Sequence, residues 1–311
     1  MPEKEEMMKM TDRTEVTDMT DITETADMKN DKRSIKLIAL DLDGTTLGKG
    51  GLSRRTKDAL EKAIEKGIHV VIATGRVYTA LPEEIFQIKG LEYIITSNGA
   101  HITRLPDEEV IYSNCADGED MERVSHLLEA NAEFPIEVFT QGKAYIDRDV
   151  FEDLRENGSD YMSVEYIMKT RKPVRGIYEF LRSNKNAIEN INVHFRSMEE
   201  KKKFWKRLGM EQGITITTSF AANIEIGGRT TSKATALSGL CDILGMDATC
   251  VMACGDSHND IAMIKWAGIG VAMENADEEV KSAAQFITLS NVEDGVAFAV
   301  ERFALANNRG M

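Results

Sequence analysis

The chain has 311 residues, 42% of them hydrophobic, which is enough to form one large or two modest globular domains. Its formal net charge of −14 argues against a nucleic-acid-binding protein, because affinity for a phosphate backbone comes mostly from clustered Lys and Arg. No apolar stretch approaches the roughly 20 residues that span a bilayer, and the N-terminus lacks the apolar segment of a secretory signal, so we expect a cytoplasmic protein that does not act at a membrane.

Residues 1–33 differ in composition from the rest of the chain. They carry ten acidic residues against six basic ones and no aromatic residue. Such a segment cannot bury enough apolar area to offset the entropy lost on ordering, so we predict a disordered acidic tail. A short docking helix is the alternative, because Val, Met and Ile are scattered through "TEVTDMTDITETADM".

From residue 34 onward, apolar runs alternate with helical patterns. The runs "IKLIAL", "HVVIAT" and "EYIITS" predict buried strands. Residues 54–67 predict a helix that ends at Gly67, and a further helix is expected between the second and third strands.

The middle of the chain, residues 113–228, alternates in shorter units. "PIEVFT" and "KAYID" predict a hairpin, and "INVHF" predicts another strand. Residues 197–209 predict an amphipathic helix, and "GITITTS" with "ANIEIG" predicts a second strand pair. This segment is therefore expected to form a separate α+β domain.

After residue 228 the first pattern returns. The apolar runs "TCVMACG", "GIGVAM" and "QFITL" predict strands, and the segments between and around them predict helices at residues 232–244, 259–266, 277–284 and 292–304. Apolar strands that alternate with helices predict an α/β fold with a Rossmann-like, doubly wound parallel sheet. Residues 34–112 and 229–311 would form this core, with the middle segment inserted into it.

Polar, glycine-bearing loops follow four of the predicted core strands: "DLDGTT", "TGR", "SNGA" and "GDSHND". Ligands of open parallel sheets bind beyond the carboxyl ends of the strands, so these loops are expected to converge. Asp41 and Asp43 lie one residue apart, and carboxylates this close repel each other unless a cation lies between them. With Asp256 at the same edge, the oxygens predict a magnesium site.

Other residues near these loops indicate a phosphoryl group as the ligand. Thr74 and Gly75 offer a hydroxyl and backbone amides to an anion. Lys233 adds a positive charge, and Asn259 adds an amide donor. The pattern predicts a phosphoryl-sized pocket in which one carboxylate attacks and a second moves a proton.

At these motifs the chain resembles the haloacid dehalogenase superfamily, and in particular its Cof-type sugar-phosphate phosphatases with a large inserted cap. The matching motifs run in family order over residues 34–311. They are "DLDGTTL" (41–47), "ATGR" (73–76), "SNGA" (97–100), Lys233, "GDSHNDIAMI" (255–264), "GVAMENA" (270–276) and "EDGVA" (293–297).

The resemblance implies a role for each matching residue. Asp41 would be the nucleophile, and Asp43 the general acid and base. The magnesium ligands would be Asp41, Asp43 through its backbone carbonyl, and Asp256. The residues implied to hold the phosphoryl group are Leu42, Thr74, Gly75, Lys233 and Asn259, and those implied to support the site from behind are Ser257 and Asp260.

The inserted domain would be a lid over this site, because an aspartyl-phosphate must be shielded during attack and then opened to water and product. Candidate substrate contacts on the cap side are His101, Asn223 and Glu225. We therefore predict a magnesium-dependent phosphatase of small phosphorylated metabolites, such as hexose phosphates or flavin mononucleotide.

Two alternatives share the fold. One is a phosphotransferase or phosphomutase, in which the phosphoryl group passes to a second substrate. The other is a non-enzymatic regulatory protein, against which the intact Asp41, Asp43, Lys233 and Asp256 argue.

Overall fold

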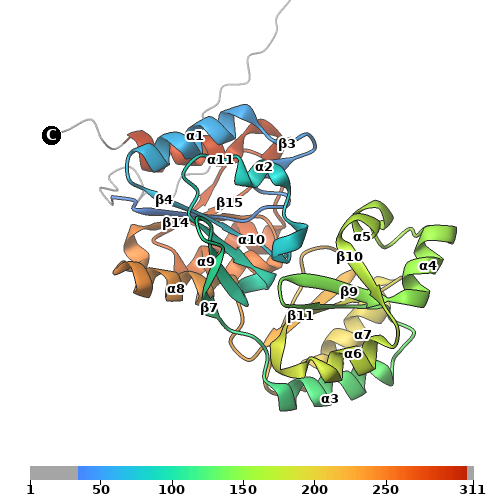
Figure 1. Ribbon diagram of the computed structural model, residues 1–311. Coiled ribbons are helices and arrows are strands. Elements are labelled where there is room, and N and C mark those ends of the chain that lie inside the picture. The colour runs from blue at the N-terminus through green and yellow to red at the C-terminus, as the bar shows by residue number, and fades with distance from the viewer. Residues whose placement is uncertain (1–33, 307–311) are drawn as a thin grey trace, which may run out of the picture.

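The computed structural model describes residues 34–306, so the acidic tail expected at residues 1–33 lies outside the described residues. The described chain forms two bodies, a core and a cap, joined by two connecting segments (Figure 1). Among the described residues, no helix is long and apolar enough to cross a membrane.

The core is built on an eight-stranded sheet in the order β16-β15-β14-β1-β4-β5-β6-β7. Six of its strands are parallel. They are β1 (Leu37–Leu40), β4 (His69–Ala73), β5 (Tyr93–Thr96), β14 (Val251–Gly255), β15 (Ile269–Ala272) and β16 (Phe286–Ile287).

The predicted parallel sheet is extended at one edge by two strands that the sequence did not predict. There β6 (His101–Arg104) pairs antiparallel with β5, and β7 (Glu109–Ser113) pairs antiparallel with β6. The physical reason lies in the connections, which are only a few residues long. A parallel pair needs a crossover of a dozen or more residues, whereas a short turn can join only antiparallel strands.

Helices cover both faces of the core sheet (Figure 1), which explains why its strands are apolar on both sides. From β1, Ile38 and Leu40 pack with helices α1 (Arg54–Glu65) and α11 (Gly295–Val300). Leu37 and Ala39 point to the opposite face and pack with α8 (Lys233–Leu244) and α9 (Ile261–Trp266). The core also contains the short helix α10 (Glu278–Ala283), between β15 and β16.

Three predicted core elements are shorter than expected. The helix between the second and third strands is reduced to α2 (Glu83–Phe86), which follows Pro82, a residue that disfavours helix in the position before it. The helix expected at 292–304 begins as α11 only at Gly295, because Asp294 has left-handed backbone with φ 61°. The last predicted strand keeps two residues, Phe286 and Ile287.

The cap is built on a six-stranded sheet in the order β10-β9-β8-β11-β13-β12. Both predicted strand pairs are present as antiparallel neighbours, β8 with β9 and β12 with β13. The strands are β8 (Ile136–Thr140), β9 (Lys143–Asp147), β10 (Arg171–Val174), β11 (Ile188–His194), β12 (Ile214–Thr217) and β13 (Asn223–Gly228).

One face of the cap sheet is apolar and the other polar. Along β11, Ile191 and Val193 pack into the apolar cluster formed with the cap helices, whereas Asn192 lies on the opposite face, which looks toward the core. The helices of the cap are α3 (Gly118–Glu129), α4 (Arg148–Asn157), α5 (Val164–Thr170), α6 (Ile177–Ser183) and α7 (Met198–Leu208). Of these, only α7 was predicted from the sequence.

The chain leaves the core after β7 and returns to it after β13. The last core strand before the cap ends at Ser113, and the last cap strand ends at Gly228. The main apolar cluster of the cap is distinct from the two clusters on the faces of the core sheet, and a small cluster of Val77, Ala80, Phe139 and Ala144 joins the two bodies. A further small hairpin, β2 (Leu47–Gly48) with β3 (Gly51–Leu52), follows the first polar loop.

Candidate active site

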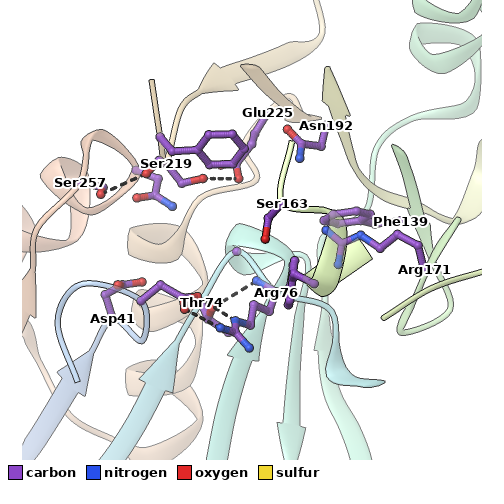
Figure 2. Close-up of a pocket in the computed structure, with 15 residues that line it drawn as sticks. Asp41, Thr74, Arg76, Phe139, Ser163, Arg171, Asn192, Ser219, Glu225 and Ser257 are labelled. Carbon is purple, nitrogen blue, oxygen red and sulfur yellow. Dashed lines mark hydrogen bonds and ion pairs between the residues drawn. The ribbon is translucent and has the colours of Figure 1, made fainter. Parts of the chain in front are cut away.

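A cavity of about 460 Å³ lies between the carboxyl edge of the core sheet and the polar face of the cap. Figure 2 shows side chains from both bodies pointing into it. The core lines it with Asp41, Asp43, Thr74, Gly75, Arg76, Ser257 and Asn259, and the cap with Phe139, Ser163, Tyr166, Arg171, Asn192, Ser219, Phe220 and Glu225. The predicted convergence of the strand-end loops is therefore present in the structure.

Asp41 directly follows β1 and is only 5% exposed. Lys233, at the first turn of α8, donates from Nζ to Asp41 Oδ1 and to Asp260 Oδ1, the latter at 2.7 Å. The lysine is itself buried, and burial alone would lower its pKa, but the charges of Asp260 and Asp41 hold that pKa above its usual value. Lys233 is therefore a permanent positive charge beside the Asp41 carboxylate.

Asp260 supports the loop that follows β14. Its Oδ2 accepts from the backbone N–H groups of Asp256 and Ser257, both at 3.0 Å. Asp256 points the other way, where its Oδ1 accepts from Thr45 Oγ1 at 2.6 Å. Burial, reinforced by the nearby charge of Asp260, raises the pKa of Asp256 to about 6 and that of Asp41 well above its usual value. A bound cation near these acids would favour their ionised forms and so lower both pKa values.

The donor set fits a magnesium ion. Carboxylate oxygens of Asp41, Asp256 and Asp260 lie within 4.8 Å of one another. They are hard oxygen ligands of the kind that magnesium prefers. Asp260 accepts three hydrogen bonds, whereas Asp256 accepts two, from Thr45 and Ser257, and Asp41 accepts one, from Lys233. Asp41 and Asp256 therefore retain more free lone pairs for a cation than Asp260 does.

Gly44 allows the first loop to pass close to Asp256. Its φ is +82°, and a Cβ atom there would lie 2.4 Å from Asp256 Oδ2. Only glycine meets both requirements, the left-handed backbone and the close approach.

Asp43 has a different environment from Asp41. Its side chain is 56% exposed and forms a two-pronged ion pair with Arg76, with Nε–Oδ2 at 2.8 Å and Nη2–Oδ1 at 2.5 Å. The Arg76 guanidinium also lies over the ring of Tyr166 in the cap, 5.0 Å from its centroid. In the sequence, Arg76 was noted only as the last residue of the motif "ATGR", with no role predicted for it. The available signal was its position in the polar loop after β4, the strand beside β1, where an arginine can reach a strand-end carboxylate.

The structure places the predicted phosphate-binding residues at two depths. Thr74, Gly75 and Asn259 line the cavity, and Thr74 Oγ1 accepts from the backbone N–H of Arg76 at 3.1 Å. The Leu42 side chain is fully buried in the apolar core, so this residue can contribute only through its backbone.

The three cap-side candidates lie in three different places. Glu225 lines the cavity, whereas Asn223 lies behind it and donates to Asn192 Oδ1 at 3.0 Å. His101 is not among the described residues that line the cavity. Because the chain reverses direction just before β6, His101 lies instead near the connection to the cap, with Nε2 3.4 Å from Cys115 Sγ.

The aromatic and cationic wall of the cap was not predicted from the sequence. Arg171 forms a buried ion pair with Glu137 at 2.9 Å, and its guanidinium lies 5.3 Å from the ring centroid of Phe139 and 4.6 Å from that of Tyr166. Burial opposes the charge of Glu137, but Arg171 and His194 hold the pKa of that carboxyl well below its usual value. These residues come from separate strands and a helix, so no local motif marks them.

Comparisons with known proteins agree with this geometry. The family model for haloacid dehalogenase-like hydrolases matches residues 38–300. The chain is 32% identical over 276 residues to a 5-amino-6-(5-phospho-D-ribitylamino)uracil phosphatase of Bacillus subtilis, YcsE, covering 87% of this chain and 96% of the relative. It is 31% identical over 282 residues to the phosphatase YwpJ of the same organism, covering 85% of this chain and 98% of the relative.

A solved structure shares the whole architecture. A haloacid dehalogenase-like hydrolase from B. subtilis superposes with a TM-score of 0.74 at 30% identity, covering 86% of this chain and 99% of the other. The family resemblance inferred from the motifs is thus confirmed over both the core and the cap. The chain belongs to the haloacid dehalogenase-like hydrolases, and it is a phosphatase of that family.

Proposed function

We propose that this phosphatase hydrolyses phosphomonoesters of small metabolites, with magnesium as cofactor and an aspartyl-phosphate on Asp41 as intermediate, in the cytoplasm. The observation that supports it most strongly is the placement of Asp41. This buried carboxylate lines the cavity, with one oxygen paired to Lys233 and with Asp256 nearby.

The two carboxylates after β1 divide the chemistry. Asp41 attacks the phosphorus atom and displaces the alcohol, while Lys233 holds the attacking group in place and offsets negative charge on the phosphoryl oxygens. When protonated, Asp43 gives that proton to the leaving oxygen. The carboxylate so formed, which is the form that pairs with Arg76, takes a proton in the second step from the water that hydrolyses the aspartyl-phosphate. The two parallel hydrogen bonds that Arg76 donates set the orientation of the Asp43 carboxyl group.

The chain's own residues also suit the cofactor. Asp41 and Asp256, with the backbone carbonyl of Asp43, would hold magnesium, and Asp260 and Ser257 would support them. When bound, the ion supplies positive charge against the carboxylates and the phosphoryl oxygens. Thr74, Gly75 and Asn259, together with the backbone at Leu42, would bind those oxygens.

The substrate is proposed to be a sugar phosphate or a similar phosphorylated metabolite. A cavity of about 460 Å³ suits such a molecule. Its cap wall offers an amide at Asn192, a hydroxyl at Ser219 and aromatic rings at Phe139, Tyr166 and Phe220, which together suit a leaving group with several polar atoms. The ribitylaminouracil phosphate named for one relative has this character and belongs in the first screen.

The test is phosphate release from a panel of phosphorylated metabolites with magnesium and with excess chelator. We expect turnover that needs magnesium, needs no acceptor sugar, and is lost in Asp41→Asn. Release only in the presence of an acceptor would instead identify a phosphotransferase. Full turnover in excess chelator would contradict the magnesium assignment.

A further inference from the structure

The turn after β5 has an unusual backbone. Ser97, Asn98 and Gly99 all have positive φ, at 49°, 55° and 103°. Left-handed backbone at non-glycine residues is costly and persists only where the surroundings hold it. On the side of α8, a Cβ atom at Gly99 would lie 2.1 Å from the carbonyl oxygen of Ser232, so this turn packs tightly against the start of the helix that carries Lys233.

Two buried glutamates of the cap hold this core turn. Ser97 Oγ donates to Glu189 Oε2 at 2.6 Å, and Asn98 Nδ2 donates to Glu225 Oε2 at 2.9 Å. Glu189 belongs to β11 and Glu225 to β13, so both contacts cross from the cap to the core.

Of these two contacts, only the one between Asn98 and Glu225 is linked by a further hydrogen bond to a residue of the active site. Asn98 Oδ1 accepts from Asn259 Nδ2 at 3.0 Å, and Asn259 lines the cavity as a proposed phosphate-binding residue. The hydrogen bonds therefore run from Asn259 to Asn98 to Glu225. On its other oxygen, Glu225 accepts from Ser219 Oγ at 2.8 Å, and Figure 2 shows both residues on the cap side of the cavity.

The direction of these hydrogen bonds follows from the chemistry of Glu225. Burial raises the pKa of Glu225, but its two oxygens face three donors, Asn98 Nδ2, Ser219 Oγ and Asn223 Nδ2, so it acts as an acceptor. The amide nitrogen of Asn98 therefore faces Glu225, and its amide oxygen faces Asn259. That oxygen uses one N–H of Asn259 Nδ2 and leaves the second N–H for a ligand. Asn259 Oδ1 is buried without a hydrogen-bond partner among the described residues. The orientation of the Asn259 amide therefore depends on the hydrogen bond that its nitrogen donates to Asn98.

We propose that Glu225 is a positioning residue for phosphate binding: through Asn98 it orients Asn259, so that the cap must be seated on the core for the phosphate site to be complete. The proposal rests on the proposed function, in which Asn259 binds the phosphoryl group. It gives the left-handed turn at Asn98 a role, because this turn places one side chain between the cap and the phosphate loop.

Glu225→Gln tests the proposal with almost no change of shape. The glutamine amide would place a donor against Asn98 or Ser219, and the Asn98 amide would lose its fixed orientation. We expect KM for the best substrate and the inhibition constant of inorganic phosphate to rise together by about tenfold, as for loss of one well-placed hydrogen bond to an anion. We expect kcat to change by less than about threefold. Unchanged phosphate inhibition in a folded variant would overturn the proposal.

Glu189→Gln is the matched control. It changes another buried cap carboxylate that holds the same turn, but Glu189 contacts Ser97, His101 and the backbone N–H of Gly142 rather than Asn98. We expect thermal stability to fall in both variants and phosphate inhibition to change only in Glu225→Gln. An equal rise in both would mean that the turn is merely loosened, which would refute the positioning role.

Asn98→Gly breaks the same link from the other side and keeps the left-handed backbone. We expect the rise in the phosphate inhibition constant to match that of Glu225→Gln, and the double variant to be no worse than either single variant, because both act through one path. Additive effects would contradict the proposal. If the parent protein releases no phosphate from any substrate, the proposed function itself fails, whereas an active parent with unaffected variants refutes only this inference.

Discussion

At the scale of single residues, Asp41 and Asp43 are neighbours in sequence with opposite environments. Asp41 is buried and paired with a buried lysine, whereas the Asp43 side chain is 56% exposed and paired with an arginine at the mouth of the cavity. A buried, fixed carboxylate suits a nucleophile, and an accessible one suits a group that exchanges protons with substrate and water.

The division of roles predicts different products from the two isosteric changes. Asp41→Asn should form no phosphoenzyme. Asp43→Asn should lose about 10²–10⁴ in rate, the usual contribution of general acid–base catalysis. With a substrate that has a good leaving group, its first step needs little acid help, so a phosphorylated enzyme should accumulate. Rapid quench and intact-protein mass measurement would detect it, and phosphate on any residue other than Asp41 would contradict the mechanism.

The environment of Asp256 predicts a link between magnesium and pH. Its pKa is about 6 in the fold against an ordinary value of 3.8, so the folded state binds the extra proton between those values. Without magnesium, this group should therefore make the protein less stable as pH rises from 4 to 6, with no further change above that range.

Magnesium should remove this dependence, because the ion stabilises the ionised carboxylate in the folded state only. Melting temperatures across this pH range, with and without magnesium, provide the measurement. Asp256→Asn is the control, and its stability should lack both the pH-dependent component and the response to magnesium. A parent protein that gains no stability from magnesium at pH 7 would count against the site.

At the scale of elements, the strand-end turns place the catalytic groups, and glycine is needed where two turns meet. Gly44 and Gly67 have nearly the same left-handed backbone, with φ of +82° and +79°. Their surroundings differ, because a Cβ atom at Gly44 would strike Asp256, whereas one at Gly67 would have no atom within 4 Å.

Substitution by alanine separates backbone strain from the displacement of Asp256. Gly67→Ala should lower stability by about 1 kcal/mol and leave turnover unchanged, since it introduces only an unfavourable φ. Gly44→Ala should show the same kind of stability loss and, in addition, at least a tenfold weaker apparent affinity for magnesium. Chemical denaturation and magnesium titration of turnover measure the two effects. Equal magnesium affinity in both variants would show that Asp256 does not depend on the close approach.

At the scale of the whole molecule, the active site is completed only where the cap meets the core. Arg76 connects the two bodies directly, since it pairs with Asp43 in the core and lies over Tyr166 of α5 in the cap. The guanidinium of Arg171 lies 4.6 Å from the centroid of the same ring. Tyr166 therefore lies between Arg76 and the buried Glu137–Arg171 ion pair of the cap sheet.

Arg76→Lys should therefore lower kcat by about tenfold or more, because a lysine cannot form the two parallel bonds that orient Asp43. Tyr166→Leu keeps an apolar side chain but removes the cation–π contacts, and we expect a smaller loss, mainly in KM. Steady-state kinetics of the two variants measure this difference. Arg104→Lys is the control, because Arg104 forms exposed carboxylate pairs at the end of β6 and does not line the cavity, so both constants should stay unchanged. A kcat equal to that of the parent protein in Arg76→Lys would show that Arg76 does not orient Asp43.

The sequence by itself determined the elements whose signals are local. Apolar runs identified the buried parallel strands, since each must be covered on both faces. The polar loops after them identified Asp41, Asp43, Thr74 and Asp256 as a group that converges at one sheet edge, and Lys233 was added to this group from the start of a predicted helix. The motifs in those loops also determined the family, because their order and spacing follow the chain.

The tertiary structure alone decided what depends on contacts between distant segments. The antiparallel edge formed by β6 and β7, the pairing of Asp43 with Arg76, the cap wall around Arg171, and the displacement of His101 from the cavity all join residues whose separation along the chain carries no pattern. The hydrogen bonds that connect Glu225, Asn98 and Asn259 cross two bodies and span more than a hundred residues. Local propensity specifies which segments form strands and turns, but only packing determines which side chains meet across them.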